Sequence, residues 1–127
     1  MVYFTGAGCG AVDLITVRGA RLLREADAII YTGSLVPEEL LNERKTECLV
    51  YNSAHMTLDE VIDVIEEMER TGKMTVRLHT GDPSVYGAIR EQMDRLDERN
   101  IAYEVCPGVS SFSGAAAALR AEYTLPS

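Results

Sequence analysis

The sequence predicts an α/β domain of about five mainly parallel strands, with helices on both faces of the sheet. Short apolar segments alternate along the chain with amphipathic segments at helical spacing. Several of the apolar segments stop at glycine or proline, which interrupt regular structure. Strands joined through helices are parallel and their crossovers are right-handed, so this alternation gives one parallel sheet covered on both sides.

The individual elements follow from local patterns. We expect strands over residues 2–5, 28–31, 48–51, 74–78 and 102–106. We expect helices over 14–26 and 37–41, from 58 to a stop at Gly72, from a cap at Ser84, and from Ser110 or Ser111 to near Leu119. The third helix has the clearest signature, because T-L-D-E at 57–60 fits the capping box and the apolar residues behind it fall on one face.

Composition limits the classes of protein to which the chain can belong. It has 127 residues, of which 46% are apolar and 25% charged, the balance of an ordinary globular domain. A net charge of −8 argues against a nucleic-acid binder, which needs a basic surface. No apolar run approaches the roughly 20 residues of a membrane span, and the N-terminus lacks the pattern of a signal peptide. Three separated cysteines favour free thiols in a reducing cytoplasm, and the two histidines form no zinc-site pattern.

Three loops that follow expected strands carry the candidate chemistry. They are G-A-G-C-G-A at 6–11, H-T-G-D-P-S at 79–84 and C-P-G-V-S-S at 106–111. Ligands of open α/β sheets bind at the carboxyl ends of the strands, where these loops would lie side by side. Glycines permit close backbone approach and hydroxyls supply hydrogen bonds, so the loops predict a flat slot for a ligand held largely by main chain, with no metal.

Each loop also has a simpler structural explanation. The first can be a tight strand-to-helix turn, Asp82 and Ser84 can be ordinary helix caps, and the small residues after Ser111 can serve close packing on the sheet. A dinucleotide site is disfavoured, because it needs an acid at the end of the second strand. That strand ends in Y-T-G at 31–33, and Asp27 lies at its other end.

Three segments in a fixed order carry a family resemblance. They are V-Y-F-T-G-A-G-C-G-A-V-D-L-I-T-V-R-G at 2–19, V-R-L-H-T-G-D-P-S-V-Y-G at 76–87 and V-C-P-G-V-S-S at 105–111. In this order they resemble the N-terminal domain of the tetrapyrrole methylases, which use S-adenosylmethionine. Y-T-G-S-L-V at 31–36 and S-A-H-M-T-L-D-E at 53–60 are similar to the branch of that family that methylates C11 of precorrin-4 or cobalt-precorrin-4 in cobalamin biosynthesis.

The resemblance implies a fold, a substrate and a site. Residues 1–127 would be the N-terminal α/β domain of a two-domain methylase, with the C-terminal domain absent from this chain and the active site between the two domains. A tetrapyrrole would be the substrate, S-adenosylmethionine the methyl donor, and a homodimer the usual assembly. The residues that the resemblance places at the donor are Cys9, Thr80, Gly81, Asp82, Val85, Ser110 and Ser111.

The first loop departs from the family pattern at two places. Gly8-Cys9-Gly10 stands where the family usually has G-P-G, and Ala11-Val12 stands where it usually has Asp-Pro. Because proline restricts the backbone, we expect this loop to keep its path and lose stiffness.

The catalytic residues and two other readings of the function stay open. If a base removes a ring proton, the candidates are His79, Asp82, Tyr31 and Tyr86. The carboxylates of the substrate need local cations, for which Arg18, Arg77 and Arg90 are candidates. The alternatives are a tetrapyrrole methylase for another ring position and a non-catalytic nucleotide- or flavin-binding α/β module that is complete in one domain.

Overall fold

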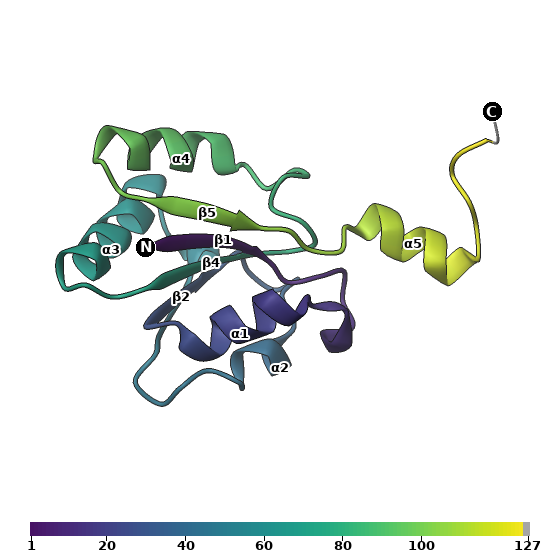
Figure 1. Cartoon of the computed structure of the whole chain (residues 1–127), viewed down its shortest axis with the longest axis horizontal. Helices are drawn as coiled ribbons and strands as arrows, with labels where there is room; N and C mark the ends of the chain where they lie inside the picture. Colours follow the sequence, from purple (N-terminus) through teal and green to yellow (C-terminus); the bar gives the residue numbers. More distant parts are fainter. Residues whose placement is uncertain (126–127) are drawn as a thin grey trace.

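The computed structural model describes residues 1–125, which form one parallel β-sheet between two layers of helices (Figure 1). The strands are β1 (Val2–Gly6), β2 (Ala28–Tyr31), β3 (Leu49–Asn52), β4 (Thr75–His79) and β5 (Tyr103–Cys106). Their order in the sheet is β3-β2-β4-β1-β5, and every neighbouring pair is parallel. The fold class predicted from the sequence is confirmed.

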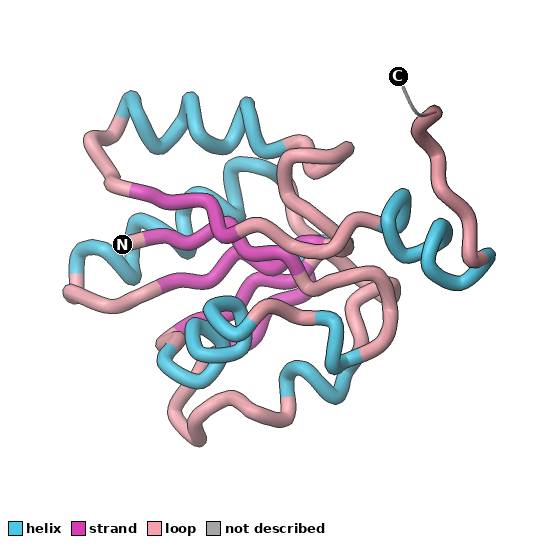
Figure 2. The backbone as a smooth tube through the Cα atoms, turned by 45° about the vertical axis from the view of Figure 1, so that its right-hand side comes forward, coloured by secondary structure: helices cyan, strands magenta, loops and turns pink. Residues whose placement is uncertain are grey.

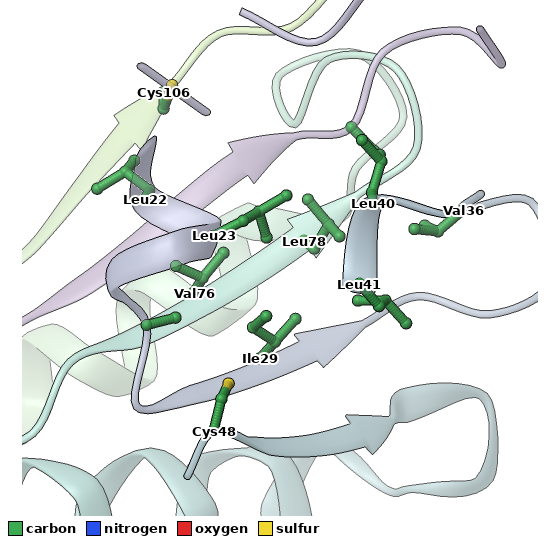
Figure 3. Close-up of a cluster of buried hydrophobic side chains, with 12 residues drawn as sticks. Leu22, Leu23, Ile29, Val36, Leu40, Leu41, Cys48, Val76, Leu78 and Cys106 are labelled. Atoms are coloured by element: carbon green, nitrogen blue, oxygen red, sulfur yellow. The ribbon is translucent and has the colours of Figure 1, made fainter. Parts of the chain in front are cut away.

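The helices are α1 (Val17–Glu25), α2 (Glu38–Leu41), α3 (Leu58–Arg70), α4 (Ile89–Glu98) and α5 (Ser111–Leu119), with single 3-10 turns at Val12–Leu14 and Ser53–His55. Helices α1 to α4 divide between the two faces of the sheet, and α5 lies on neither. On one face, Leu23 of α1 and Leu40 of α2 pack in one cluster with Ile29 and Leu78 of the strands (Figure 3). None of the helices among residues 1–125 combines the length and the apolar character needed to cross a membrane.

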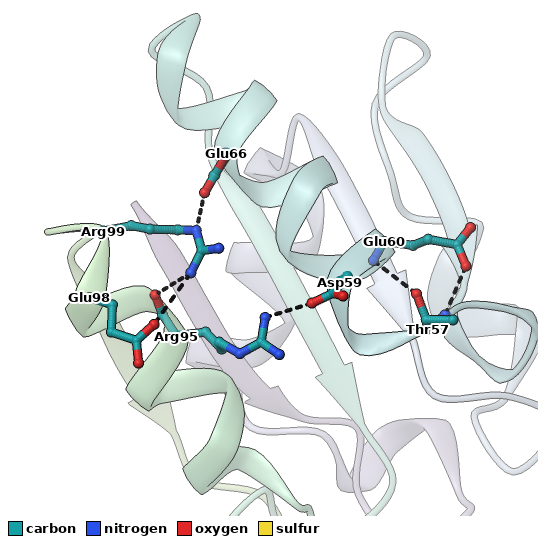
Figure 4. Close-up of polar contacts among 7 residues, drawn as sticks. All are labelled: Thr57, Asp59, Glu60, Glu66, Arg95, Glu98 and Arg99. Carbon is teal, nitrogen blue, oxygen red and sulfur yellow. Dashed lines mark hydrogen bonds and ion pairs between the residues drawn. The ribbon is translucent and has the colours of Figure 1, made fainter.

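Helices α3 and α4 cover the other face. Ile62 and Ile65 of α3 and Leu96 of α4 pack with Phe4 and Ile30 of the sheet, all five being almost fully buried. Helix α3 begins at a complete capping box: Glu60 N donates to Thr57 Oγ1 at 3.1 Å, and Thr57 N donates to Glu60 Oε1 at 3.0 Å (Figure 4). The sequence predicted this helix and its start.

Ion pairs join the exposed sides of α3 and α4. Arg95 of α4 pairs with Asp59 of α3 at 2.6 Å, and Arg99, which follows α4, pairs with Glu66 (Figure 4). Exposed pairs of this kind contribute little individually, so the apolar contacts beneath them dominate the packing of the two helices.

Two helices begin later than the sequence predicted. The helix expected from residue 14 begins at Val17, because Thr16 is extended and its hydroxyl accepts from Gly19 N at 2.9 Å, which makes it the N-cap. The helix expected from a cap at Ser84 begins at Ile89, behind a loop in which Tyr86 and Ala88 have left-handed backbones. Ser84 is therefore not a helix cap, and the residue before α4, Ala88, makes no side-chain cap at all.

Helix α5 leaves the sheet instead of packing on it. Figures 1 and 2 show it projecting beyond the carboxyl ends of the strands. Its described residues include no buried one, and Phe112 and Leu119 are 63% and 73% exposed. Close packing on the sheet, one explanation for its small residues, is therefore wrong for this chain.

Candidate functional site

The loops after β1 and β4 meet at the carboxyl ends of two adjacent strands, whose connections run in opposite directions on opposite faces of the sheet. From β1 the chain passes through α1 toward β2, and from the adjacent β4 it passes through α4 toward β5 on the opposite side. Between them Gly8 and Gly81 form an antiparallel bridge, with Gly81 N donating to Gly8 O at 2.8 Å and Gly8 N donating to Gly81 O at 3.3 Å. The carboxyl ends of parallel strands, where the connections change direction, are the usual ligand site of open α/β sheets.

Glycines let a third loop, after β5, join the first two. A Cβ on Gly6 would lie 2.4 Å from Gly81 O and 2.5 Å from Gly108 Cα, and a Cβ on Gly108 would lie 2.2 Å from Gly81 O. These distances are far inside van der Waals contact, so side chains are excluded at both positions. The three backbones therefore pack directly on one another, as the grouping of the three loops in the sequence predicted.

These loops line a cleft of about 240 Å³. Its walls are Cys9, Thr80, Gly81, Asp82, Val85, Tyr86, Ser110 and Ser111. All seven residues that the family resemblance placed at the methyl donor are in this set. Tyr86 is the one addition, and the sequence had suggested it only as a base. A wider and more apolar cleft of about 620 Å³ adjoins it along Val85, Tyr86, Ser110 and Ser111 and reaches Phe112 and Tyr123.

The polar groups of the cleft are held by local contacts. Ser110 is the N-cap of α5, since its hydroxyl accepts from Phe112 N at 3.2 Å. The Thr80 hydroxyl lies 3.5 Å from that of Thr32, which follows β2. Asp82 Oδ1 accepts only a long contact, 3.4 Å, from Ser84 N. Because α4 begins at Ile89, Asp82 does not cap it, and its half-buried carboxylate is available to a ligand.

Cys9 replaces the expected proline and packs against the start of α5. A Cβ on Gly114 would lie 2.4 Å from Cys9 Sγ, so the thiol occupies the space beside that glycine. The three thiols, those of Cys9, Cys48 and Cys106, are free in the structure. Within residues 1–125, no group of three or more His, Cys, Asp or Glu side chains is arranged to hold a metal ion.

The candidate bases differ sharply in their surroundings. His79 is 2% exposed, and burial together with the nearby Arg77 charge lowers its pKa to about 3. A histidine with that pKa stays neutral and is a weak proton acceptor at neutral pH. Asp82 and Tyr86 line the cleft, and Tyr31 is half-buried at the end of β2.

The three candidate arginines also differ in their exposure and partners. Arg77 is 6% exposed and its guanidinium donates to Gln92 Oε1 at 2.9 Å and to Ile30 O at 3.1 Å, so the expectation that it meets a substrate carboxylate is wrong. Arg90 is exposed and lies 3.8 Å from Asp94. Arg18 is exposed beside the loop that begins at Cys106.

The acid that a dinucleotide site requires is not at the end of β2. Asp27 precedes β2 and accepts hydrogen bonds from Lys45 Nζ and from Met74 N, both at 2.7 Å. The Lys45 ammonium and the Met74 amide lower the pKa of this carboxyl. Asp27 therefore ties together the amino ends of the strands, opposite the cleft.

Comparison with known proteins gives one consistent family. The model of the Tetrapyrrole (Corrin/Porphyrin) Methylases matches residues 1–127. Cobalt-precorrin-4 C(11)-methyltransferase of Methanocaldococcus jannaschii is 53% identical over 125 residues, which are 98% of this chain and 48% of that protein. Precorrin-4 C(11)-methyltransferase of Rhodococcus erythropolis is 46% identical, over 98% of this chain and 50% of that protein.

Solved structures agree. The X-ray structure of a cobalt precorrin-4 methyltransferase of cobalamin biosynthesis superposes with a TM-score of 0.95 at 46% identity, covering 98% of this chain and 52% of that one. Uroporphyrin-III C-methyltransferase of Thermus thermophilus, solved with S-adenosylhomocysteine, gives 0.76 at 32% identity, covering 91% of this chain and 47% of that one. The chain spans about half the length of the relatives it matches.

Proposed function

The chain belongs to the tetrapyrrole methylases, and from this we propose that it contributes to methyl transfer from S-adenosylmethionine to C11 of precorrin-4 or cobalt-precorrin-4. Relatives with that activity in their names are 44–53% identical over 98% of the chain. The observation that carries the proposal is the single cleft at the carboxyl ends of β1, β4 and β5, which gathers all seven residues expected at the donor.

The chemistry of the cleft fits a donor of this kind. S-adenosylmethionine supplies an activated methyl group on a positively charged sulfonium. The Asp82 carboxylate can attract that positive charge, and the hydroxyls of Thr80, Ser110 and Ser111 can accept or donate hydrogen bonds to its polar groups. The direct packing of Gly6, Gly81 and Gly108 fixes these loops in place. Because positioning of two reactants can supply roughly 7–11 kcal/mol of a barrier, such rigidity is useful for transfer from an activated donor.

We further propose that this chain is the N-terminal half of a two-domain site. Small-molecule pockets usually bury most of the ligand, whereas the cleft of about 240 Å³ and the wider cleft that adjoins it are both open on one side. The relatives are about twice as long as this chain. In this proposal the missing contacts come from a second domain, and the tetrapyrrole lies between the domains. Arg18 and Arg90 are exposed and can contact the carboxylates of the tetrapyrrole, whereas Arg77 is buried and bonded to Gln92.

Methylation at another ring position is the second candidate. Siroheme synthase of Chromobacterium violaceum is 39% identical over 121 residues, and the Thermus thermophilus uroporphyrin-III enzyme shares the fold. The higher identity to C11-methyltransferases favours the first candidate.

A hybrid enzyme tests the proposal. We expect this chain, fused to the second half of the Methanocaldococcus jannaschii relative, to add one methyl group to cobalt-precorrin-4 or precorrin-4, detected by mass spectrometry. Asp82→Asn should lower kcat/KM by about tenfold or more, since charged hydrogen bonds are worth about 1.5–3 kcal/mol. Asp63→Asn, an exposed change on α3, is the matched control and should leave the rate unchanged. Methylation of uroporphyrinogen III in place of precorrin-4 would instead establish the second candidate.

A further inference from the structure

A buried polar bridge connects the centre of the sheet to the start of α4. Arg77 of β4 and Gln92 of α4 are each 6% exposed. Arg77 Nε donates to Gln92 Oε1 at 2.9 Å, and Arg77 Nη1 donates to Ile30 O on β2 at 3.1 Å. Gln92 Nε2 in turn donates to the carbonyl of Ala88 at 3.2 Å. The bridge therefore runs from β2 through β4 and α4 to the residue that precedes α4.

The bridge is an unfavourable way to stabilise the fold, because it buries a charged side chain. Among residues 1–125, Arg77 forms no ion pair with a carboxylate, and burial lowers its pKa to about 10. Burying a charge without a counter-charge is unfavourable, and apolar residues of similar size often stabilise such a place better. The neighbouring positions on this face, Phe4 and Ile30, are apolar and fully buried. Because packing alone disfavours a buried arginine at this place, a role of Arg77 in positioning other residues accounts for its presence.

The residue at the end of the bridge sits in a constrained loop. Ala88 and Tyr86 have φ values of 53° and 57°, which are unfavourable for residues with a side chain. A Cβ on the intervening Gly87 would lie 1.9 Å from Pro83 O, so the loop folds tightly on itself. Unfavourable backbone of this kind persists only where the surroundings hold it. The partly buried hydrogen bond from Gln92 Nε2 to the Ala88 carbonyl is a contact that can do so.

Two residues of loop 83–88 line the cleft. Val85 and Tyr86 line both the smaller cleft and the adjoining apolar one. The Tyr86 side chain is fully exposed, so its direction depends on its backbone and not on packing.

We propose that Arg77 and Gln92 are positioning residues: their bridge to the Ala88 carbonyl fixes loop 83–88 and thereby aims Val85 and Tyr86 at the ligand cleft. Neither residue touches a ligand in this proposal. The inference rests on the proposed function only for the identity of that ligand.

Paired substitutions at Gln92 isolate the bridge. Gln92→Glu keeps an acceptor for Arg77 but cannot donate to the Ala88 carbonyl, whereas Gln92→Met removes both bonds. Met93→Ala is the control, because Met93 is buried on the same helix and belongs to the apolar cluster. The direct measurement is amide hydrogen exchange of residues 84–88 in the folded 127-residue chain, since Pro83 has no amide hydrogen. A second measurement is the dissociation constant of S-adenosylhomocysteine for the hybrid enzyme.

We expect exchange in 84–88 to rise about three- to tenfold in Gln92→Glu and Gln92→Met, the effect of losing one hydrogen bond. Met93→Ala should lower the melting temperature without this local rise. Unchanged exchange in a folded Gln92→Glu chain overturns the inference, and so does a Gln92→Glu chain that fails to fold, since the bridge is then structural. Faster exchange without any binding of S-adenosylhomocysteine by the wild-type hybrid would keep the positioning role and refute the proposed function instead.

Discussion

At the scale of single residues, strand β4 buries three polar side chains that alternate with its apolar ones. Thr75, Arg77 and His79 are all buried, and alternation along the strand places them on the side of α3 and α4. His79 lies 6.0 Å from the Phe4 ring, and its Nε2 has no hydrogen-bond partner among the described residues. A buried neutral histidine of this kind affects stability whenever the pH allows it to be protonated in the unfolded chain.

We predict that His79 makes the domain sensitive to mild acid. Its folded pKa of about 3 lies below the ordinary value of 6.5, so the unfolded chain binds the proton first and stability falls as the pH drops below 6.5. Near pH 5 the loss should be about 2 kcal/mol relative to pH 8. Urea unfolding of His79→Leu and of the wild type at these two pH values measures the difference. His55→Gln, at an exposed position, is the control. An equal loss in His79→Leu would refute the assignment.

The glycine contact between loops gives a second residue-scale prediction. Gly108→Ala should separate the loops after β4 and β5, because the new Cβ would lie 2.2 Å from Gly81 O. We expect binding of S-adenosylhomocysteine to the hybrid enzyme to weaken about tenfold or more, the equivalent of 1.4 kcal/mol. Gly72→Ala is the matched control: its Cβ meets nothing within 4 Å, but its φ of 70° is strained. That control should lose about 1 kcal/mol of stability and keep its affinity; equal affinities would contradict the prediction.

At the scale of elements, prediction succeeded where the signal is local. Strand β2 has the bounds predicted, and α3 follows its capping box and apolar face. Prediction failed where the backbone conformation carries no sequence pattern. We expected Ser84 to cap α4, but the helix begins only after a loop with left-handed residues that ends at Ala88. The seven residues expected at the methyl donor came from the family resemblance, and the structure brings them to one cleft. The burial of Arg77 had no sequence signal, because T-V-R-L-H alternates polar and apolar residues as a strand with one solvent face does, yet helices bury both faces of β4.

The capping box provides the element-scale prediction. Thr57→Ala removes the acceptor for Glu60 N at the start of α3 and should cost about 1 kcal/mol of unfolding free energy. Thr57→Ser keeps a hydroxyl and should recover most of it. Thr46→Ala, at an exposed position outside the helices, is the control and should change stability little. Chemical denaturation of the three variants measures these differences, and a Thr57→Ala chain as stable as the Thr46→Ala chain would show that the cap contributes nothing.

At the scale of the whole molecule, the two-domain proposal accounts for the open cleft and for the exposed helix together. Helix α5 starts at Ser111, in the wall of the cleft, and then projects beyond the sheet with Phe112 and Leu119 exposed (Figures 1 and 2). Exposed apolar residues next to a ligand cleft are typical of surfaces that another domain covers. In the two-domain proposal, that domain would close over both.

The final prediction concerns the 127-residue chain by itself. If each half of a two-domain site supplies half of the binding free energy, a ligand bound at micromolar concentration by the whole would bind the half at about millimolar or weaker. Methyl transfer should fall further, because the alignment of donor and ring is lost together with affinity. We therefore expect the chain to fold, to bind S-adenosylhomocysteine only weakly in titration calorimetry and to transfer no measurable methyl group, with both properties restored in the hybrid enzyme. Micromolar binding by the 127-residue chain would refute the shared site, because only a nucleotide-binding module complete in one domain binds that tightly without a second half.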